Sequence, residues 1–187
     1  IVKMDQYIWE EACKLIRKWI DSGVTPIPIS INVSRRHFVN TEFIQVLNHL
    51  IEKYDIPKKY LEIEITETVD ESGIGESMEI LKEDGFRLLM DDFGSGYSSL
   101  NTLKDTQFDV LKINRTFLNN FISSDRPQKI VEHTIKMAKS IEIDLIAEVV
   151  ETKEQADFLN DCGCSIAQGF YYAKPMPVDL FETNYVQ

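Results

Sequence analysis

The segment that decides the fold is Leu61-Glu-Ile-Glu-Ile-Thr66, a run in which apolar and polar side chains alternate strictly. This alternation predicts a β-strand, because successive side chains of a strand point to opposite faces of its sheet. The three apolar side chains then face one side, where helices can cover them, while Glu62, Glu64 and Thr66 face the other. A sheet with helices on both faces would bury these carboxylates, whereas the interior of a barrel that opens at the carboxyl ends of its strands tolerates them.

Five other β-rich runs are found along the chain: Ile27–Val33, Phe86–Asp91, Asp109–Ile113, Asp144–Val149 and Ser165–Gly169. Helical patterns lie around and between them: Met4–Asp21, Glu42–Tyr54, Gly75–Asp84, Pro127–Ser140, a helix to Asp161 opened by a capping box at Thr152 and Gln155, and a short helix after Pro177. The strands recur about every 28 residues, which is typical of right-handed βαβ units in a parallel sheet. A doubly wound sheet and a barrel both fit this order, and the first segment favours the barrel. We therefore expect a modified TIM-like (β/α)8 barrel, here an incomplete barrel of about six β/α units.

The composition limits the possible functions. The chain has 187 residues, which suits one domain, and its formal net charge is −11. This charge argues against a basic groove for a DNA or RNA polymer, so a phosphate-ester ligand would need a local cation. The odd number of cysteines (Cys13, Cys162 and Cys164) does not suggest a disulfide framework. We expect a cytoplasmic protein, although its parent could be anchored in a membrane.

Polar side chains stand where each predicted strand ends. They are Asn32, Glu64, Asp91 with Asp92, Lys112, Glu148 and Gln168. Because the carboxyl ends of barrel strands meet at one mouth, we expect these side chains to converge there. Four carboxylates in one place repel each other, and hard divalent cations with oxygen ligands remove that cost. The four acids and the Asn32 amide suffice for two Mg²⁺ or Mn²⁺ ions, and Lys112 could neutralise a phosphate oxygen or orient the attacking water.

Simpler explanations exist for each of these residues taken alone. A strand-end acid is often merely solvated, adjacent aspartates often cap a turn or helix, and a strand-end lysine often lies on the surface. Repetition at six successive strand ends favours a common site. Gly94-Ser-Gly96 lacks the GxGxxG spacing of a dinucleotide loop and instead predicts a flexible loop over that site.

Several stretches together resemble the EAL domain, the cyclic di-GMP phosphodiesterase of bacterial signalling. They are Ser30-Ile-Asn32-Val-Ser34, Glu64-Ile-Thr-Glu67, Asp91-Asp-Phe-Gly-Ser-Gly-Tyr-Ser-Ser-Leu100, Leu111-Lys112-Ile113, Ala147-Glu148-Val-Val-Glu151 and Gln168-Gly169 running on to Lys174-Pro175. Their order and spacing match the family over the whole chain. The resemblance implies metal-dependent hydrolysis of cyclic di-GMP to linear pGpG, with Mg²⁺ or Mn²⁺ in a two-ion site.

The resemblance also implies a role for each residue. The metal ligands would be Asn32, Glu64, Asp91 and Glu148, with Asp92 on a second ion. The residues acting on the reaction would be Lys112, Glu148 as a possible base, Gln168 beside the metal and its water, and Glu67, which would hold the loop Phe93–Ser99. Glu151 and Asn114 would lie at the rim, in reach of the substrate. A homodimer formed through the barrel, beside the loop after the Asp-Asp pair, and other signalling domains in the parent chain are further expectations.

The chain departs from the family pattern at several points. It contains no Glu-Ala-Leu segment, so residues 1–187 resemble a single EAL domain truncated at its N-terminus. Asn114 replaces a usual aspartate, Val149 a usual glycine and Ser95 a common threonine. These departures keep a second function open, that of a catalytically silent receptor for cyclic di-GMP or a protein partner. The two sheet edges left by an incomplete barrel would be covered by residues outside this sequence or by a second copy.

Overall fold

The computed structural model describes residues 2–39, 41–66, 74–94, 99–118 and 125–186, and its strands form one parallel sheet in the order β1-β2-β3-β4-β5-β6. The strands are β1 (Ile29–Asn32), β2 (Leu61–Thr66), β3 (Arg87–Phe93), β4 (Val110–Ile113), β5 (Asp144–Ala147) and β6 (Ile166–Ala167). The helices are α1 (Val2–Asp21), α2 (Glu42–Tyr54), α3 (Ile74–Glu83), α4 (Ser99–Asp105), α5 (Arg115–Leu118), α6 (Asp125–Ser140), α7 (Lys153–Asp161) and α8 (Val178–Tyr185). Short 3-10 turns cover Arg35–Val39 and Lys58–Tyr60. The predicted incomplete barrel of six units is confirmed.

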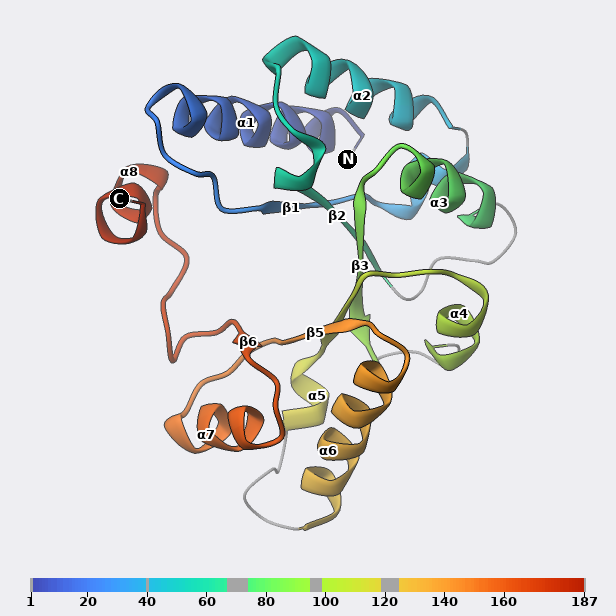
Figure 1. The fold of residues 1–187 in the computed structure, drawn as a ribbon, viewed down its shortest axis with the longest axis vertical. Helices are drawn as coiled ribbons and strands as arrows, with labels where there is room; N and C mark the ends of the chain where they lie inside the picture. The colour runs from blue at the N-terminus through green and yellow to red at the C-terminus, as the bar shows by residue number, and fades with distance from the viewer. Residues whose placement is uncertain (1, 40, 67–73, 95–98, 119–124, 187) are drawn as a thin grey trace.

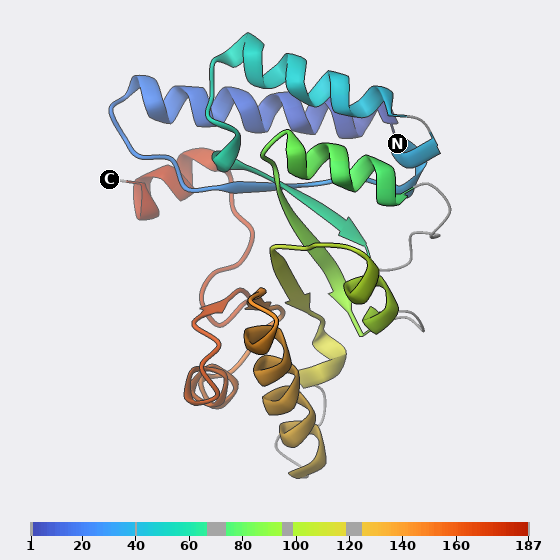
Figure 2. The ribbon, with the colours of Figure 1, turned by 45° about the vertical axis from the view of Figure 1, so that its right-hand side comes forward.

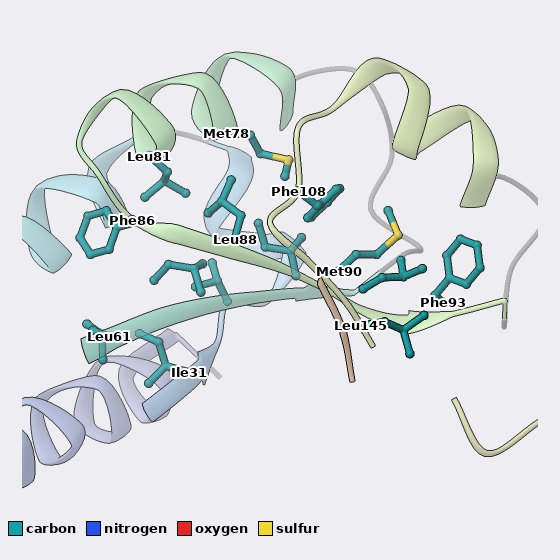
Figure 3. Packing of buried hydrophobic residues seen from close by; sticks show 14 of the residues in the cluster. Ile31, Leu61, Met78, Leu81, Phe86, Leu88, Met90, Phe93, Phe108 and Leu145 are labelled. Atoms are coloured by element: carbon teal, nitrogen blue, oxygen red, sulfur yellow. The ribbon is translucent and has the colours of Figure 1, made fainter. Parts of the chain in front are cut away.

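The outer face of the sheet is covered by helices, as the alternation in β2 predicted. Ile31, Ile63, Leu88 and Met90 have at most 2% of their surface exposed, and they pack in one hydrophobic cluster with side chains of the helices. Figure 3 shows this packing around β2 and β3, where Leu81 of α3 meets the outer face of the sheet. A fully buried aliphatic side chain stabilises a fold by about 1.5–3 kcal/mol, so this layer carries much of the stability.

The inner face of the sheet carries charged residues at both ends of its strands. Arg87 donates from Nη1 to Oε1 of Glu62 at 2.8 Å, and its Nη2 also pairs with Asp144. This ion pair explains how Glu62 is tolerated with 8% of its surface exposed, because a buried carboxylate needs a partner. It lies at the amino ends of β2, β3 and β5, away from the carboxyl ends where the predicted site lies.

Among the described residues, no pairing joins β1 to β6, so both are edge strands of an open sheet. A cavity of about 850 Å³ lies between them, and its walls include Trp19 of α1, Ile29 of β1 and Phe181 of α8. Helix α8 is tied to α1, since Trp19 donates from Nε1 to Glu182 at 3.0 Å and Lys18 pairs with the same carboxylate at 2.7 Å. Figure 2 shows α8 lying close to α1 and β1.

The element bounds differ from the prediction at the two edges and after β3. The predicted strands Ile27–Val33 and Ser165–Gly169 shorten to four and two residues, because an edge strand has a neighbour on one side only. Helices α4 and α5 were not predicted. Both are too short to show a helical period, and the sequence of α4, SLNTLKD, is mostly polar. The capping box at Thr152 and Gln155 is confirmed at the start of α7. Within the described part of the chain, no helix is both long and apolar enough to cross a membrane.

Candidate active site at the carboxyl ends of the strands

The strand registers bring the predicted residues to one end of the inner face. Asn32 pairs with Glu64, Thr66 with Asp91, and Lys112 with Ile146. Paired residues of neighbouring parallel strands point to the same side, so Asn32, Glu64 and Lys112 share the inner face. Glu148 follows β5 directly, and its backbone N–H donates to the carbonyl of Ile113 at 3.1 Å, which continues the ladder by one residue.

Lys112 is the centre of the site. Its Nζ lies 2.9 Å from Oε1 of Glu64, 2.9 Å from Oε1 of Glu148 and 3.4 Å from Oδ1 of Asp91. The side chains of Lys112 and Glu64 are 5% and 8% exposed, so these charges face each other with little water between them. Buried charge clusters of this kind add little net stability when all members are present, but removing one member is costly because an uncompensated buried charge is left behind.

The two consecutive aspartates both reach the site because the strand is irregular between them. In a regular strand, neighbours point to opposite faces, so Asp91 and Asp92 could not both point inward. The β3–β4 register shifts between Met90 and Phe93, and Asp92 has a positive φ of 57°. This bulge turns Asp92 back, so that carboxylate oxygens of Asp91, Asp92 and Glu148 lie within 4.8 Å of one another.

The three-carboxylate cluster of Asp91, Asp92 and Glu148 fits a divalent cation. Its donors are all oxygens, which hard cations such as Mg²⁺ and Mn²⁺ prefer. Oδ1 of Asp91 is buried and forms no well-aligned hydrogen bond with any residue that the structure describes, although Lys112 Nζ lies 3.4 Å away. A single long ionic contact compensates this buried anionic oxygen only in part, so it is available to a metal cation as a ligand.

The pKa values follow from this geometry. Burial raises the pKa of Asp91 and of Glu148 above the usual range, although Lys112 opposes the rise in both cases. Burial also disfavours the charge on Lys112, but the hydrogen bonds with Glu64 and Glu148 outweigh it and raise the lysine's pKa. The lysine therefore stays charged, and the cluster around it carries excess negative charge that a further cation would neutralise.

Two neutral amides hold members of the cluster. Gln168 donates from Nε2 to Oε1 of Glu148 at 2.6 Å. Asn114, predicted as a substrate contact, donates from Nδ2 to Oδ1 of Asp92 and accepts from the backbone N–H of Thr116 at 2.9 Å. Sequence reasoning missed this link, and nothing in the local pattern signals it, because Asp92 lies in β3 whereas Asn114 follows β4.

The remaining predicted residues lie farther out. Asn32 has an exposed side chain next to Glu64, and its backbone carbonyl accepts a hydrogen bond from Nε1 of Trp9 at 3.1 Å. Glu151 is exposed at the rim and lies 3.6 Å from Nη2 of Arg115. Glu67 lies outside the described residues, as does most of the loop after Gly94 that it was expected to hold.

Residues with positive φ surround the site. Val149, next to Glu148, has φ of 55°, a conformation that is unfavourable for a β-branched residue. The family glycine noted above would adopt it without strain. Gly169, next to Gln168, has φ of 156°, and a Cβ there would stand 2.2 Å from the carbonyl oxygen of Val150. The backbone on both sides of Glu148 is thus closely packed.

Comparisons with known proteins agree with this architecture. The chain is 34% identical over 185 residues to the signaling protein YkoW of Bacillus subtilis, and 35% identical over 184 residues to the cyclic di-GMP phosphodiesterase RocR of Pseudomonas aeruginosa. These matches cover 97% and 95% of this chain but only 23% and 47% of those proteins, so the chain spans less than half of either relative.

Solved structures show the same fold. The PaMucR phosphodiesterase in its c-di-GMP complex superposes with a TM-score of 0.87 at 30% identity, covering 97% of this chain and 74% of that one. The EAL domain of Mycobacterium smegmatis DcpA gives 0.88 at 32% identity, covering 95% and 82%. The EAL domain model matches residues 1–175. The chain therefore belongs to the EAL domain family.

Proposed function

We propose that this chain forms most of a phosphodiesterase domain that hydrolyses one phosphodiester of cyclic di-GMP to give linear pGpG. The observation that carries the proposal is the position of Lys112 among Glu64, Asp91 and Glu148 at the carboxyl ends of the strands. Relatives such as RocR and NbdA are named cyclic di-GMP phosphodiesterases, and PaMucR is known in complex with c-di-GMP. These names support the same substrate for this chain.

The metal ligands in this proposal are Asn32, Glu64, Asp91, Asp92 and Glu148, and the ions are Mg²⁺ or Mn²⁺. Bound there, divalent ions would lower the pKa of water and neutralise charge on the attacking and leaving oxygens. The buried Oδ1 of Asp91, which forms no well-aligned hydrogen bond among the described residues, and the oxygen-only cluster support this assignment. Two ions fit the number of acids better than one, because Lys112 offsets only one of four negative charges.

The chain's own residues divide the remaining work. The Lys112 ammonium can neutralise a non-bridging phosphate oxygen as charge develops on it. Glu148 can accept a proton from the attacking water, and its burial-raised pKa makes it a better base than an exposed carboxylate. Gln168 fixes the orientation of Glu148 through its 2.6 Å hydrogen bond, and Glu151 at the rim can contact the guanine end of the substrate.

A second candidate function is that of a silent receptor that binds cyclic di-GMP without cleaving it. It is favoured by Asn114, whose amide binds Asp92 where the family usually has an acid, and by the strained Val149 beside Glu148. Either feature could misplace a ligand by the ångström or so that abolishes catalysis.

The deciding experiment incubates the protein with cyclic di-GMP and Mn²⁺ or Mg²⁺, and follows pGpG by chromatography. Asp91→Ala should abolish turnover, and Lys112→Ala should slow it by about 10²-fold or more. Lys82→Ala, which breaks a partly buried pair with Asp109 outside the site, is the matched control and should keep the wild-type rate. Binding without pGpG would establish the receptor, and neither binding nor pGpG would refute both functions.

We also propose that the domain forms a homodimer. A largely apolar groove of about 780 Å³ runs from Phe93 and Gly94 to Ile130 of α6, with exposed Leu100 on its edge. It adjoins the Asp91-Asp92 segment, which supports a homodimer through this face of the barrel. Ile130→Glu should lower the mass measured by light scattering from dimer to monomer, and an unchanged mass would refute this interface.

Three further points remain predictions: other signalling domains in the parent chain, the single-domain boundary 1–187 and the cytoplasmic location.

A further inference from the structure

The Lys112 side chain and a divalent cation compete for the same ligands. Lys112 Nζ contacts Oε1 of Glu148 at 2.9 Å and Oδ1 of Asp91 at 3.4 Å. The same two residues supply two of the three carboxylates that lie within 4.8 Å of one another. An ammonium group and a divalent ion bound to shared carboxylates would be only a few ångströms apart and would repel each other.

The contacts also account for how Glu64, Asp91 and Glu148 lie close to one another. Lys112 hydrogen-bonds Glu64, and its ammonium lies between carboxylates from β2, β3 and the end of β5. With 5% of its side chain exposed, the ammonium is not a solvated surface charge. Its position neutralises part of the repulsion that would otherwise drive these strand ends apart.

The lysine can move while its backbone stays fixed. Lys112 lies inside β4, where pairing with Ile146 of β5 holds the main chain. Its four-carbon side chain has rotatable bonds that let the ammonium swing toward the open mouth of the barrel, where a phosphate would approach.

We propose that Lys112 is the resident counter-ion of the metal-free site, and that cation binding displaces its ammonium from Asp91 and Glu148. The lysine thereby weakens cation binding, and it becomes free to meet the substrate phosphate only when the cation is present. This inference rests on the cation site of the proposed function and adds an order to it: the cation binds first, and the lysine is released afterwards.

The test is calorimetric titration of Mn²⁺ into the wild-type protein and into Lys112→Met, which keeps an unbranched side chain only one atom shorter and removes its charge. We expect Mn²⁺ to bind Lys112→Met about tenfold more tightly or more, because a positive charge beside the ion is gone. The metal-free melting temperature should fall in the same variant, and the rise on adding Mn²⁺ should exceed the wild-type rise. Lys82→Met, which removes a pair outside the site, should leave the Mn²⁺ affinity within about twofold of wild type.

A second measurement needs no variant, in case Lys112→Met does not fold without metal. Nitrogen-15 NMR of lysine side chains in the wild-type protein should give a protected Lys112 ammonium signal that Mg²⁺ titration shifts or removes. Equal or weaker Mn²⁺ binding by Lys112→Met, or a Lys112 signal unchanged at saturating Mg²⁺, would overturn the inference alone. Wild-type protein that binds neither ion would instead refute the cation site itself.

Discussion

Asn114 donates a hydrogen bond from its amide to the Asp92 carboxylate, across the gap between the end of β4 and the bulge in β3. The same amide accepts a hydrogen bond from the N–H of Thr116 at the start of α5. One neutral side chain thus satisfies an acid of the site and begins a helix. An aspartate could do only the second, because two carboxylates at this distance repel.

Asn114 variants should therefore respond to metal in opposite ways. Without metal, Asn114→Ala should lose about 1–2 kcal/mol of unfolding free energy with its two hydrogen bonds, and Asn114→Asp should lose more because a charge is added beside Asp92. With saturating Mn²⁺, Asn114→Asp should become more stable than Asn114→Ala, since the extra carboxylate then has a cation nearby. Urea unfolding with and without Mn²⁺ measures the unfolding free energies of both variants. If Asn114→Asp stays the less stable of the two in Mn²⁺, Asn114 does not act on the cation site.

Gly169 is required by a close approach of two backbone segments. A Cβ there would stand 2.2 Å from the oxygen and 2.3 Å from the nitrogen of Val150, so Gly169→Ala should destabilise the fold by about 1–3 kcal/mol or more. Gly75→Ala is the matched control: it lies in α3 with nothing within 4 Å of a new Cβ, and it should be neutral or stabilising by up to about 1 kcal/mol. Equal effects of the two substitutions in urea unfolding would contradict the contact.

Val149 pays a conformational cost that glycine would not. Its φ of 55° lies in the left-handed region, which disfavours a side chain with a Cβ by about 1–2 kcal/mol. Val149→Gly should therefore raise the free energy of unfolding or leave it unchanged, even though it shortens an apolar side chain. Val150→Ala, at a neighbour that is fully buried, should instead lower it by about 2 kcal/mol. A destabilised Val149→Gly would mean that its side-chain contacts outweigh the strain.

Cys13 should make the fold less stable in alkali. Burial raises the pKa of this thiol from 9.0 to about 12. Between these values the unfolded chain has lost the proton while the folded chain keeps it, so unfolding releases protons and its free energy falls as pH rises. The contribution is complete below pH 9.0 and is lost as the pH approaches 12.

Replacing this thiol should remove its part of the pH dependence. Cys13→Ala should show a shallower decline of stability above pH 9.0 than wild type, whatever its stability at neutral pH. Cys162→Ala is the control, because that thiol is only partly buried and its pKa is raised less strongly. Parallel stability curves for wild type and Cys13→Ala would show that the thiol does not stay protonated in the folded state.

Local residue patterns were sufficient for much of this protein. The alternation in Leu61–Thr66 determined which side chains face the helices and which face the interior, because a strand's geometry fixes a period of two. The recurring strand–helix order determined the parallel sheet, and polar residues at successive strand ends identified the edge on which the candidate site lies. These features depend on neighbours in sequence, so they can be read without knowing how distant segments pack.

Tertiary structure alone decided how those side chains meet. The bulge that turns Asp92 beside Asp91 comes from the register between β3 and β4, and the Asn114 amide reaches Asp92 only once those strands pair. The ion contacts of Lys112 likewise join residues 48 positions apart, from Glu64 to Lys112. Such distances are set by the packing of whole strands and helices against one another, and no local period of the sequence encodes them.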